Sequence, residues 1–199
     1  MGRKKLLPNR DGLILEAAAL LFSARSYEKT TLDEIAVQAG VSKGSIYLEF
    51  ASKEQILYRL IQRNKDTELA EMRHIAAQQS GSALALLKTL LIQNMGAIFD
   101  SVQQKQLSLE EIQQTRKHLF SQIKPYIEAR LAIVEDLLAR AEQEGDIKPL
   151  PDRHRTAQLI LMALRAVRPP YREEANRASV QQDAAEILDL IMNGLREHA

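Results

Sequence analysis

Apolar residues recur along most of this chain with the period of an α-helix. Between residues 31 and 40 they share one helical face, at Leu32, Ile35, Ala36 and Ala39. Thr31, followed by Glu34, forms a capping box that satisfies two amide donors at a helix start. Gly40 predicts a left-handed end to this helix, because glycine adopts positive φ without a steric penalty.

A second short helix is predicted directly after this turn. Ser42 is a suitable N-cap, and Ile46 and Phe50 share the face that can pack on the preceding helix. Small, hydroxyl and cationic side chains lie away from that face, at Ser42, Lys43, Gly44, Ser45 and Tyr47. Such a surface lets the backbone approach a polyanion closely while offering hydrogen-bond donors. Residues 31–50 therefore predict a helix-turn-helix whose second helix enters the DNA major groove.

Residues 30–57 closely resemble the DNA-binding domain of the tetracycline-repressor-like (TetR) family. The matching residues are Thr30, Thr31, Ile35, Ala36, the run from Ala39 to Gly44, Ile46, Tyr47, Phe50 and the run from Ser52 to Glu54. The resemblance implies a ligand-responsive homodimeric repressor that binds a palindromic operator. It also implies a DNA-binding domain over residues 1–51 and an effector-binding and dimerisation domain over residues 52–199. Gly12 and Ser26 depart from the family pattern, since Ser26 stands where the family often has a helix-ending glycine.

The whole chain is predicted to be all-α, with about nine helices and no strand. Asn9 is a plausible N-cap of the first helix, and Asp152 is one for a later helix. Three further capping boxes predict helix starts, at Ser52 with Gln55, Ser108 with Glu111, and Ser179 with Gln182. Pro125 suits the first turn of a helix that ends at Gly145.

The predicted DNA contacts fall into two classes. Lys43, Ser42 and Ser45 can reach base edges, and Gly44 permits close approach. The candidates for phosphate contact are Tyr47, Lys53, Thr31 and the basic arm of Arg3, Lys4 and Lys5. Structural alternatives remain open: the arm as a solvated tail, Tyr47 packed on the first helix, and Thr31 acting only as a cap.

The last two predicted helices carry apolar residues on more than one side, as in residues 160–162 and 190–192. Helices sandwiched within one chain would show the same pattern. The resemblance implies instead that they pair with their copies in a four-helix homodimer interface. The candidate interface residues are Leu161, Leu164, Ile187, Ile191 and Leu195.

An effector pocket in the second domain is likewise implied by the resemblance. Its candidate lining residues are Met95, Phe99, Tyr126, Arg130, Met162, Arg165 and Tyr171. Helical methionines and aromatic residues are also typical of ordinary core. Arg165 interrupts an apolar run, so it is a candidate to meet an anionic effector, an acidic residue of the partner subunit, or only water.

Composition agrees with a cytoplasmic regulator. The chain is 45% hydrophobic, carries a net charge of +1 and has no cysteine, which excludes disulfides and thiolate sites. No uninterrupted apolar run approaches the roughly 20 residues that span a bilayer. Because the four histidines are scattered, we expect no metal site. The sequence also contains no phosphate-binding glycine loop and no nucleophile elbow, so we expect no cofactor and no enzymatic activity. The alternative function is a TetR-like co-regulator or adaptor whose body docks another protein.

Overall fold

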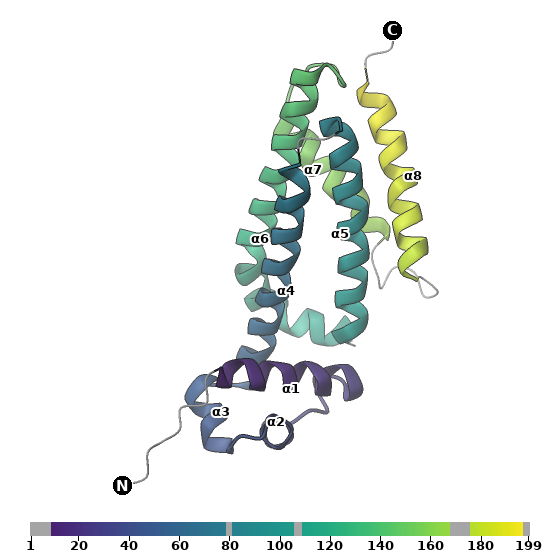
Figure 1. Cartoon of the computed structure of the whole chain (residues 1–199). Helices are drawn as coiled ribbons and strands as arrows, with labels where there is room; N and C mark the ends of the chain where they lie inside the picture. The colour runs from purple at the N-terminus through teal and green to yellow at the C-terminus, as the bar shows by residue number, and fades with distance from the viewer. Residues whose placement is uncertain (1–8, 79–80, 106–108, 168–175, 197–199) are drawn as a thin grey trace. The chain divides into compact units, whose positions relative to one another are not determined.

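The computed structural model describes residues 9–78, 81–105, 109–167 and 176–196, and the side chains of these residues outside 101–123. Helices account for the regular structure of this part, and it contains no strand, which confirms the all-α prediction (Figure 1). Eight are α-helices: α1 Arg10–Arg25, α2 Leu32–Ala39, α3 Lys43–Glu49, α4 Lys53–Ala76, α5 Ala83–Lys105, α6 Leu109–Glu144, α7 Arg153–Ala163 and α8 Arg177–Leu195. A single 3-10 turn, Leu164–Val167, follows α7.

The chain forms two compact units. The first comprises the described parts of Met1–Arg63 and Gln103–Leu119, and the second those of Asn64–Val102 and Phe120–Ala199. The division between them at Arg63 and Asn64 lies inside α4. Helix α4 therefore contributes to both units, as do α5 and α6, which cross the other two divisions.

The first unit is built on α1, which packs on α2, while α2 packs on α3. Its core consists of buried side chains from these helices and the start of α4: Ile14, Ala18, Phe22, Ile35, Ile46, Phe50, Ile56 and Leu57. The capping box of Thr31 and Glu34 is present at the start of α2. Gly40 ends that helix with φ 66°, as its sequence position predicts.

The two departures from the family pattern, Gly12 and Ser26, lie near the ends of α1. Asn9 occupies the N-cap but makes no capping hydrogen bond with its side chain. A Cβ atom at Gly12 would lie 2.5 Å from Asn9 Nδ2, so a larger residue there would displace that side chain. Ser26 ends the helix with φ 76°, an unusual value for a residue with a side chain.

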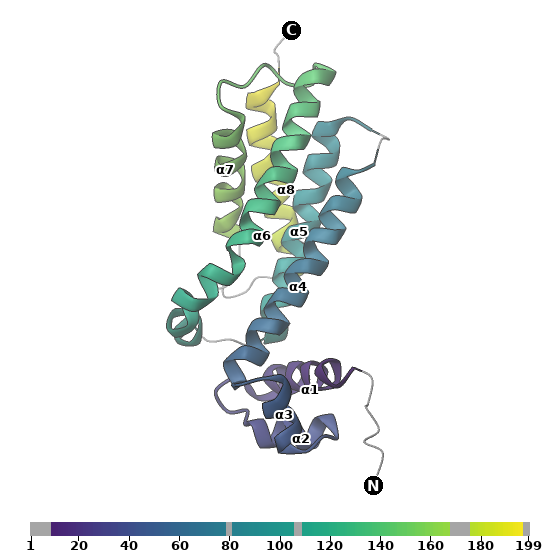
Figure 2. The ribbon, with the colours of Figure 1, turned by 90° about the vertical axis from the view of Figure 1, so that its left-hand side faces the viewer.

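The second unit holds the larger core, to which the latter part of α4 and helices α5 to α8 contribute. Figures 1 and 2 show α7 and α8 lying side by side within this unit. Residues Ala83–Asp100 of α5 are long and apolar enough to cross a membrane by length and composition, although Lys88 and Asp100 interrupt the apolar run. However, 61% of that stretch is buried, which is typical of the core helix of a folded domain.

Two helix starts differ from the prediction. Pro125 lies inside α6 and does not begin a new helix, because α6 continues from Leu109 to Glu144. The capping box of α8 is formed by Asn176 and Ser179, three residues earlier than predicted. Asp152 does cap α7, accepting a hydrogen bond from the Arg155 amide at 2.8 Å. The predicted cap at Ser108 lies outside the described residues.

Candidate functional site

Helix α3 is the most exposed helix of the first unit and buries only Ile46. Its start is fixed by Ser42, whose Oγ accepts a hydrogen bond from the Ser45 amide at 3.1 Å. The two serine hydroxyl groups lie 2.8 Å apart. Outward from this start lie Lys43 and Tyr47, the latter 52% exposed. About half of the Tyr47 side chain is therefore accessible to an external partner.

Close approach to the α3 backbone is possible at Gly44. A Cβ atom built there would have only one neighbour within 4 Å, the Ser42 hydroxyl oxygen at 3.9 Å. The glycine is therefore not required by internal packing. Its effect is to leave the first turn of α3 open to an external partner.

Lys43 is held by Asp33, which lies in the first turn of α2. The Lys43 Nζ atom lies 2.7 Å from Asp33 Oδ1 and 2.9 Å from Asp33 Oδ2. Hydrogen bonding to Asp33 raises the pKa of Lys43 above its ordinary value. Both side chains are more than half exposed, so this pair is screened by water and can exchange for another anion.

The cation at the start of α4 faces inward. Lys53 Nζ donates hydrogen bonds to the carbonyl oxygens of Tyr27, Glu28 and Thr30, at 2.8, 3.3 and 2.9 Å. It also lies 4.3 Å from the centroid of the Tyr27 ring. Lys53 therefore stabilises the loop between α1 and α2, a role that its sequence position did not reveal.

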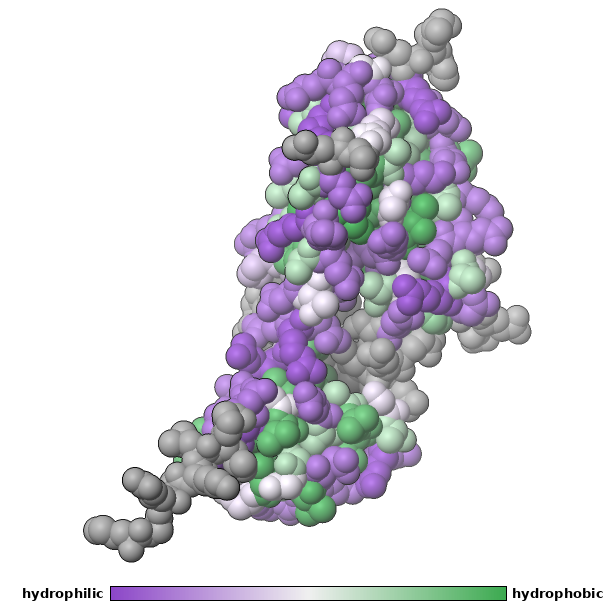
Figure 3. All heavy atoms as spheres, in the orientation of Figure 1, coloured by the Kyte–Doolittle hydropathy of each residue, from purple (hydrophilic) through white to green (hydrophobic). Residues whose placement is uncertain are grey.

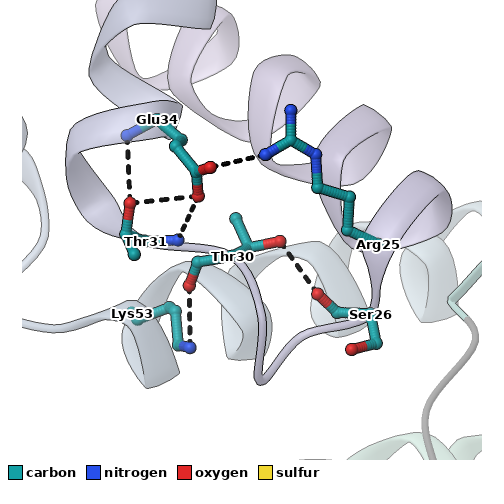
Figure 4. A network of polar contacts seen from close by, with 6 residues as sticks. All are labelled: Arg25, Ser26, Thr30, Thr31, Glu34 and Lys53. Atoms are coloured by element: carbon teal, nitrogen blue, oxygen red, sulfur yellow. Dashed lines mark hydrogen bonds and ion pairs between the residues drawn. The ribbon is translucent and has the colours of Figure 1, made fainter.

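The same loop contains a polar network (Figure 4). Thr30 Oγ1 donates to the Ser26 carbonyl oxygen at 2.8 Å, which holds the loop at the strained residue. Thr31 Oγ1 accepts from the Glu34 amide at 3.2 Å, and the Thr31 amide donates to Glu34 Oε2 at 2.9 Å. This backbone hydrogen bond lowers the pKa of Glu34, and Arg25 lowers it further. The network fixes α2, on which α3 packs.

The first unit exposes several large apolar side chains. Figure 3 shows apolar residues on the face drawn. The large exposed apolar side chains of this unit include Leu13, Leu20, Val37 and Leu48. The predicted basic arm, Arg3, Lys4 and Lys5, lies outside the described residues.

The second unit buries a polar cluster of Glu68, Asn94, Tyr126 and Arg130. Tyr126 donates its hydroxyl hydrogen to Glu68 Oε2 at 2.7 Å, and Lys65 Nζ reaches both Glu68 oxygens at 2.8 and 2.9 Å. Sequence reasoning included Tyr126 and Arg130 but missed Glu68 and Asn94. A signal existed for Glu68, because it lies seven residues after Ile61 on the apolar stripe of α4.

The other effector candidates lie in different environments. Met95 and Phe99 are buried in the core, whereas Met162 and Arg165 are exposed. Tyr171 lies outside the described residues. A separate groove of about 470 Å³ is lined by residues of α4 and α6 and the residue after α4: Arg73, Ala76, Ala77, Ala129, Ala132, Ile133, Asp136, Leu137 and Arg140.

Helices α7 and α8 expose an apolar surface, to which Leu159, Met162 and Leu190 contribute most. Among the predicted interface residues, Leu161, Ile187, Ile191 and Leu195 are partly buried against the core. Leu164 is fully buried within the chain, so its side chain belongs to the core.

Two comparisons of sequence identify relatives of this chain. Residues 14–60 match the family described as "Bacterial regulatory proteins, tetR family". The HTH-type transcriptional repressor KstR2 of Mycobacterium tuberculosis (strain ATCC 25618 / H37Rv) is 30% identical over 142 residues, covering 71% of this chain and 70% of that protein.

Solved structures share the fold over nearly the whole chain. A transcriptional regulator from Cytophaga hutchinsonii superposes with a TM-score of 0.80 at 18% identity, covering 94% of this chain and 98% of that chain. The regulator FadR from Bacillus subtilis, solved in complex with stearoyl-CoA, gives 0.69 at 22% identity, covering 93% and 99%. Together with the helix-turn-helix geometry, these similarities show that the chain belongs to the TetR family of bacterial DNA-binding transcriptional regulators.

Proposed function

We propose that this regulator is a homodimeric repressor that binds a palindromic operator and releases it when a small molecule binds the second unit. The observation that carries the DNA-binding part is the exposed start of α3, where Lys43, Gly44 and Tyr47 face away from the core. A short helix presented in this way matches the docking geometry of recognition helices in the major groove.

The proposed contacts divide between bases and phosphates. Lys43, Ser42 and Ser45 contact base edges, which requires Lys43 to exchange Asp33 for a guanine acceptor. Tyr47, Thr31 and the basic arm of Arg3, Lys4 and Lys5 contact phosphates. We assign Lys53 a positioning role, because its ammonium group already serves three backbone carbonyls of the α1–α2 loop.

The proposed dimer uses the apolar surface of α7 and α8. Leu190 is 76% exposed and Met162 is 53% exposed, an unfavourable state for large apolar side chains in a monomer. Pairing with the same helices of a second copy would bury them. A two-fold axis would then place two α3 helices on half-sites about one DNA turn, roughly 34–36 Å, apart.

The proposed switch uses α4, since this helix contributes to both units. An effector held in the second unit next to Glu68 would change the tilt of α4, and so the spacing of the two recognition helices. Near-complete release requires the effector to prefer the non-binding state by roughly 10⁴-fold. The FadR complex with stearoyl-CoA is a precedent for ligand binding on the same fold.

Selection of bound duplexes from a random DNA library at moderate salt tests the proposal. The double variant Lys43→Ala, Tyr47→Ala is selected in parallel, with Lys29→Ala as the control because Lys29 is exposed in the same unit outside α3. Moderate salt suppresses sequence-independent phosphate binding. We expect a palindrome from the wild type and the control, and no enrichment by the double variant.

Two negative results would have different consequences for the proposal. If the folded dimer enriches no sequence, DNA reading is excluded and a co-regulator that docks another protein becomes the better account. If an operator is found but crosslinking the two recognition units at fixed spacing leaves induction intact, the repressor stands and the α4 mechanism fails.

A further inference from the structure

Three polar side chains lie almost fully inside the core of the second unit. Glu68 on α4, Asn94 on α5 and Arg130 on α6 are only 5%, 4% and 6% exposed. Buried polar groups are costly unless they find partners, and a buried charge is more costly still. The hydrogen-bond partners of each group therefore indicate whether the cluster needs a further partner from outside the protein.

Both oxygens of the Glu68 carboxylate have hydrogen-bond partners within the protein. Lys65 Nζ lies 2.8 and 2.9 Å from its two oxygens, and the Tyr126 hydroxyl group donates to Oε2 at 2.7 Å. Lys65 also lies 4.6 Å from the centroid of the Tyr126 ring. The charge of Glu68 is thus matched by Lys65, so this pair carries no net charge.

The hydrogen bonding of Arg130 and Asn94 within the protein is incomplete. The Nε and Nη2 atoms of Arg130 have no hydrogen-bond partner, and neither has Oδ1 of Asn94. Nε–H and one Nη2–H point from the same edge of the guanidinium group, the arrangement that binds both oxygens of a carboxylate. The unmatched donors therefore form one bidentate anion-binding edge.

Both incomplete side chains lie close to the same residue, Tyr126. Burial raises the pKa of Tyr126 to about 12, against the opposing effects of the Arg130 charge and of a hydrogen bond from Asn94. Burial also lowers the pKa of Arg130; Tyr126 and the Glu68 charge oppose this effect, and the nearby Arg165 charge adds to it. Lys65, Glu68 and Arg130 together carry one excess positive charge, which a single monoanion would balance.

The surroundings of the cluster are apolar. On α5, Leu90, Leu91 and Ile98 lie three or four residues from Asn94 and are buried, as is the adjacent Met95. A ligand whose charged group reached Arg130 would therefore place its remainder among hydrocarbon side chains. Water alone would not balance the charge.

We propose that Arg130 and Asn94 bind the carboxylate end of an apolar organic acid, with Arg130 Nε and Nη2 donating to its two oxygens. Asn94 Oδ1 accepts a hydrogen bond from a hydroxyl or amide group of the same ligand. Tyr126 and Lys65 are positioning residues, since both bind the Glu68 carboxylate. This inference rests on the proposed function in one respect, namely that the bound acid is the effector that controls operator binding.

Calorimetry and thermal unfolding of the full chain test this site, with decanoate, 4-phenylbutanoate and cholate as linear, aromatic and polycyclic monocarboxylates. The neutral amide of each acid and decyl phosphate are the comparison ligands. We expect at least one acid to bind and to raise the Tm, while its amide binds about tenfold more weakly or worse.

Variants of two arginines of α6 locate the site. Arg130→Met should weaken acid binding about tenfold or more and leave the unliganded chain folded, because it removes an unpaired buried charge. Arg140→Met is the matched control, since Arg140 lines the separate groove between α4 and α6. Arg130→Lys keeps the charge but loses the two-pronged geometry, so it should bind with intermediate affinity.

Several results would overturn the proposal. These are equal binding of acid and amide, unchanged binding by Arg130→Met, loss of binding only in Arg140→Met, preference for decyl phosphate, or binding of none of the acids. Measuring operator binding by the wild type, with and without the acid, distinguishes failure of this inference from failure of the proposed function. An acid that binds through Arg130 without changing operator affinity supports the site and removes its role as effector.

Discussion

Lys53 and Tyr27 are joined twice: the lysine ammonium nitrogen lies 2.8 Å from the tyrosine carbonyl oxygen and 4.3 Å from the centroid of its ring. The first turn of α4 thereby closes the loop that leads from α1 to α2. Removing this cation should loosen the whole three-helix region, not one contact with DNA.

Lys53→Met should lower the free energy of unfolding of the first unit by roughly 1–3 kcal/mol, because backbone carbonyls lose a charged donor. Hydrogen exchange of the amides of residues 10–50 measures this, with Lys29→Met as the control on an exposed lysine. Unchanged exchange combined with weaker DNA binding would instead identify Lys53 as a phosphate contact.

Asp33→Asn should increase operator affinity about two- to fivefold. The substitution frees Lys43, and exposed ion pairs of this kind contribute about 0.2–1 kcal/mol. A double-mutant cycle with Lys43→Met, followed by fluorescence anisotropy at constant salt, isolates the pair. If Asp33→Asn has the same effect with and without Lys43, only general repulsion between Asp33 and DNA is involved.

Ser26→Gly should stabilise the first unit by roughly 0.5–1 kcal/mol, because glycine adopts a φ of 76° without strain. The hydrogen bond from Thr30 uses the Ser26 carbonyl oxygen and is retained. Chemical denaturation measures the change, and Ser26→Ala is the control that removes the hydroxyl group but keeps the strain. A gain of the same size in both variants would contradict the backbone explanation.

Stability at high pH should depend on Tyr126. Its folded-state pKa of about 12 exceeds the ordinary 10.0, mainly through burial, so its contribution is complete below pH 10 and lost as pH rises towards 12. At about pH 11 the loss is roughly 1 kcal/mol. Urea unfolding between about pH 9 and 11 should therefore show a shallower decline for Tyr126→Phe than for the wild type. Tyr47→Phe, at an exposed site, should keep the wild-type slope.

Leu190→Lys should shift the chain from dimer to monomer in sedimentation experiments and abolish cooperative operator binding. Leu190 is 76% exposed on α8, so the substitution should leave the folded chain intact. Leu20→Lys changes an equally apolar exposed residue of α1 and serves as the control. A monomer produced by the control alone would place the interface on the first unit.

The sequence predicted the helix-turn-helix well because its determinants are local. The capping box of Thr31, the end at Gly40 and the cap at Ser42 each depend on residues within four positions. The interactions of Lys53 span 23 to 26 positions, so no periodic pattern could reveal them.

The body was predicted less well for related reasons. Pro125 predicts a helix start, but α6 continues through it and lacks one amide donor inside the helix. Asn176 and Ser179 compete for the cap of α8, and local sequence does not decide between such overlapping signals. The polar cluster needs three helices to assemble, and only Tyr126 and Arg130 of its members were anticipated.

The continuity of α4 across Arg63 and Asn64 has a consequence for evolution and engineering. Inserting one residue at this junction would rotate everything beyond it by about 100° and advance it by about 1.5 Å. Inserting seven would restore the angle to within about 20°. Exchange of DNA-binding segments between relatives should therefore succeed only when helical phase is preserved, whatever the similarity of the exchanged sequences.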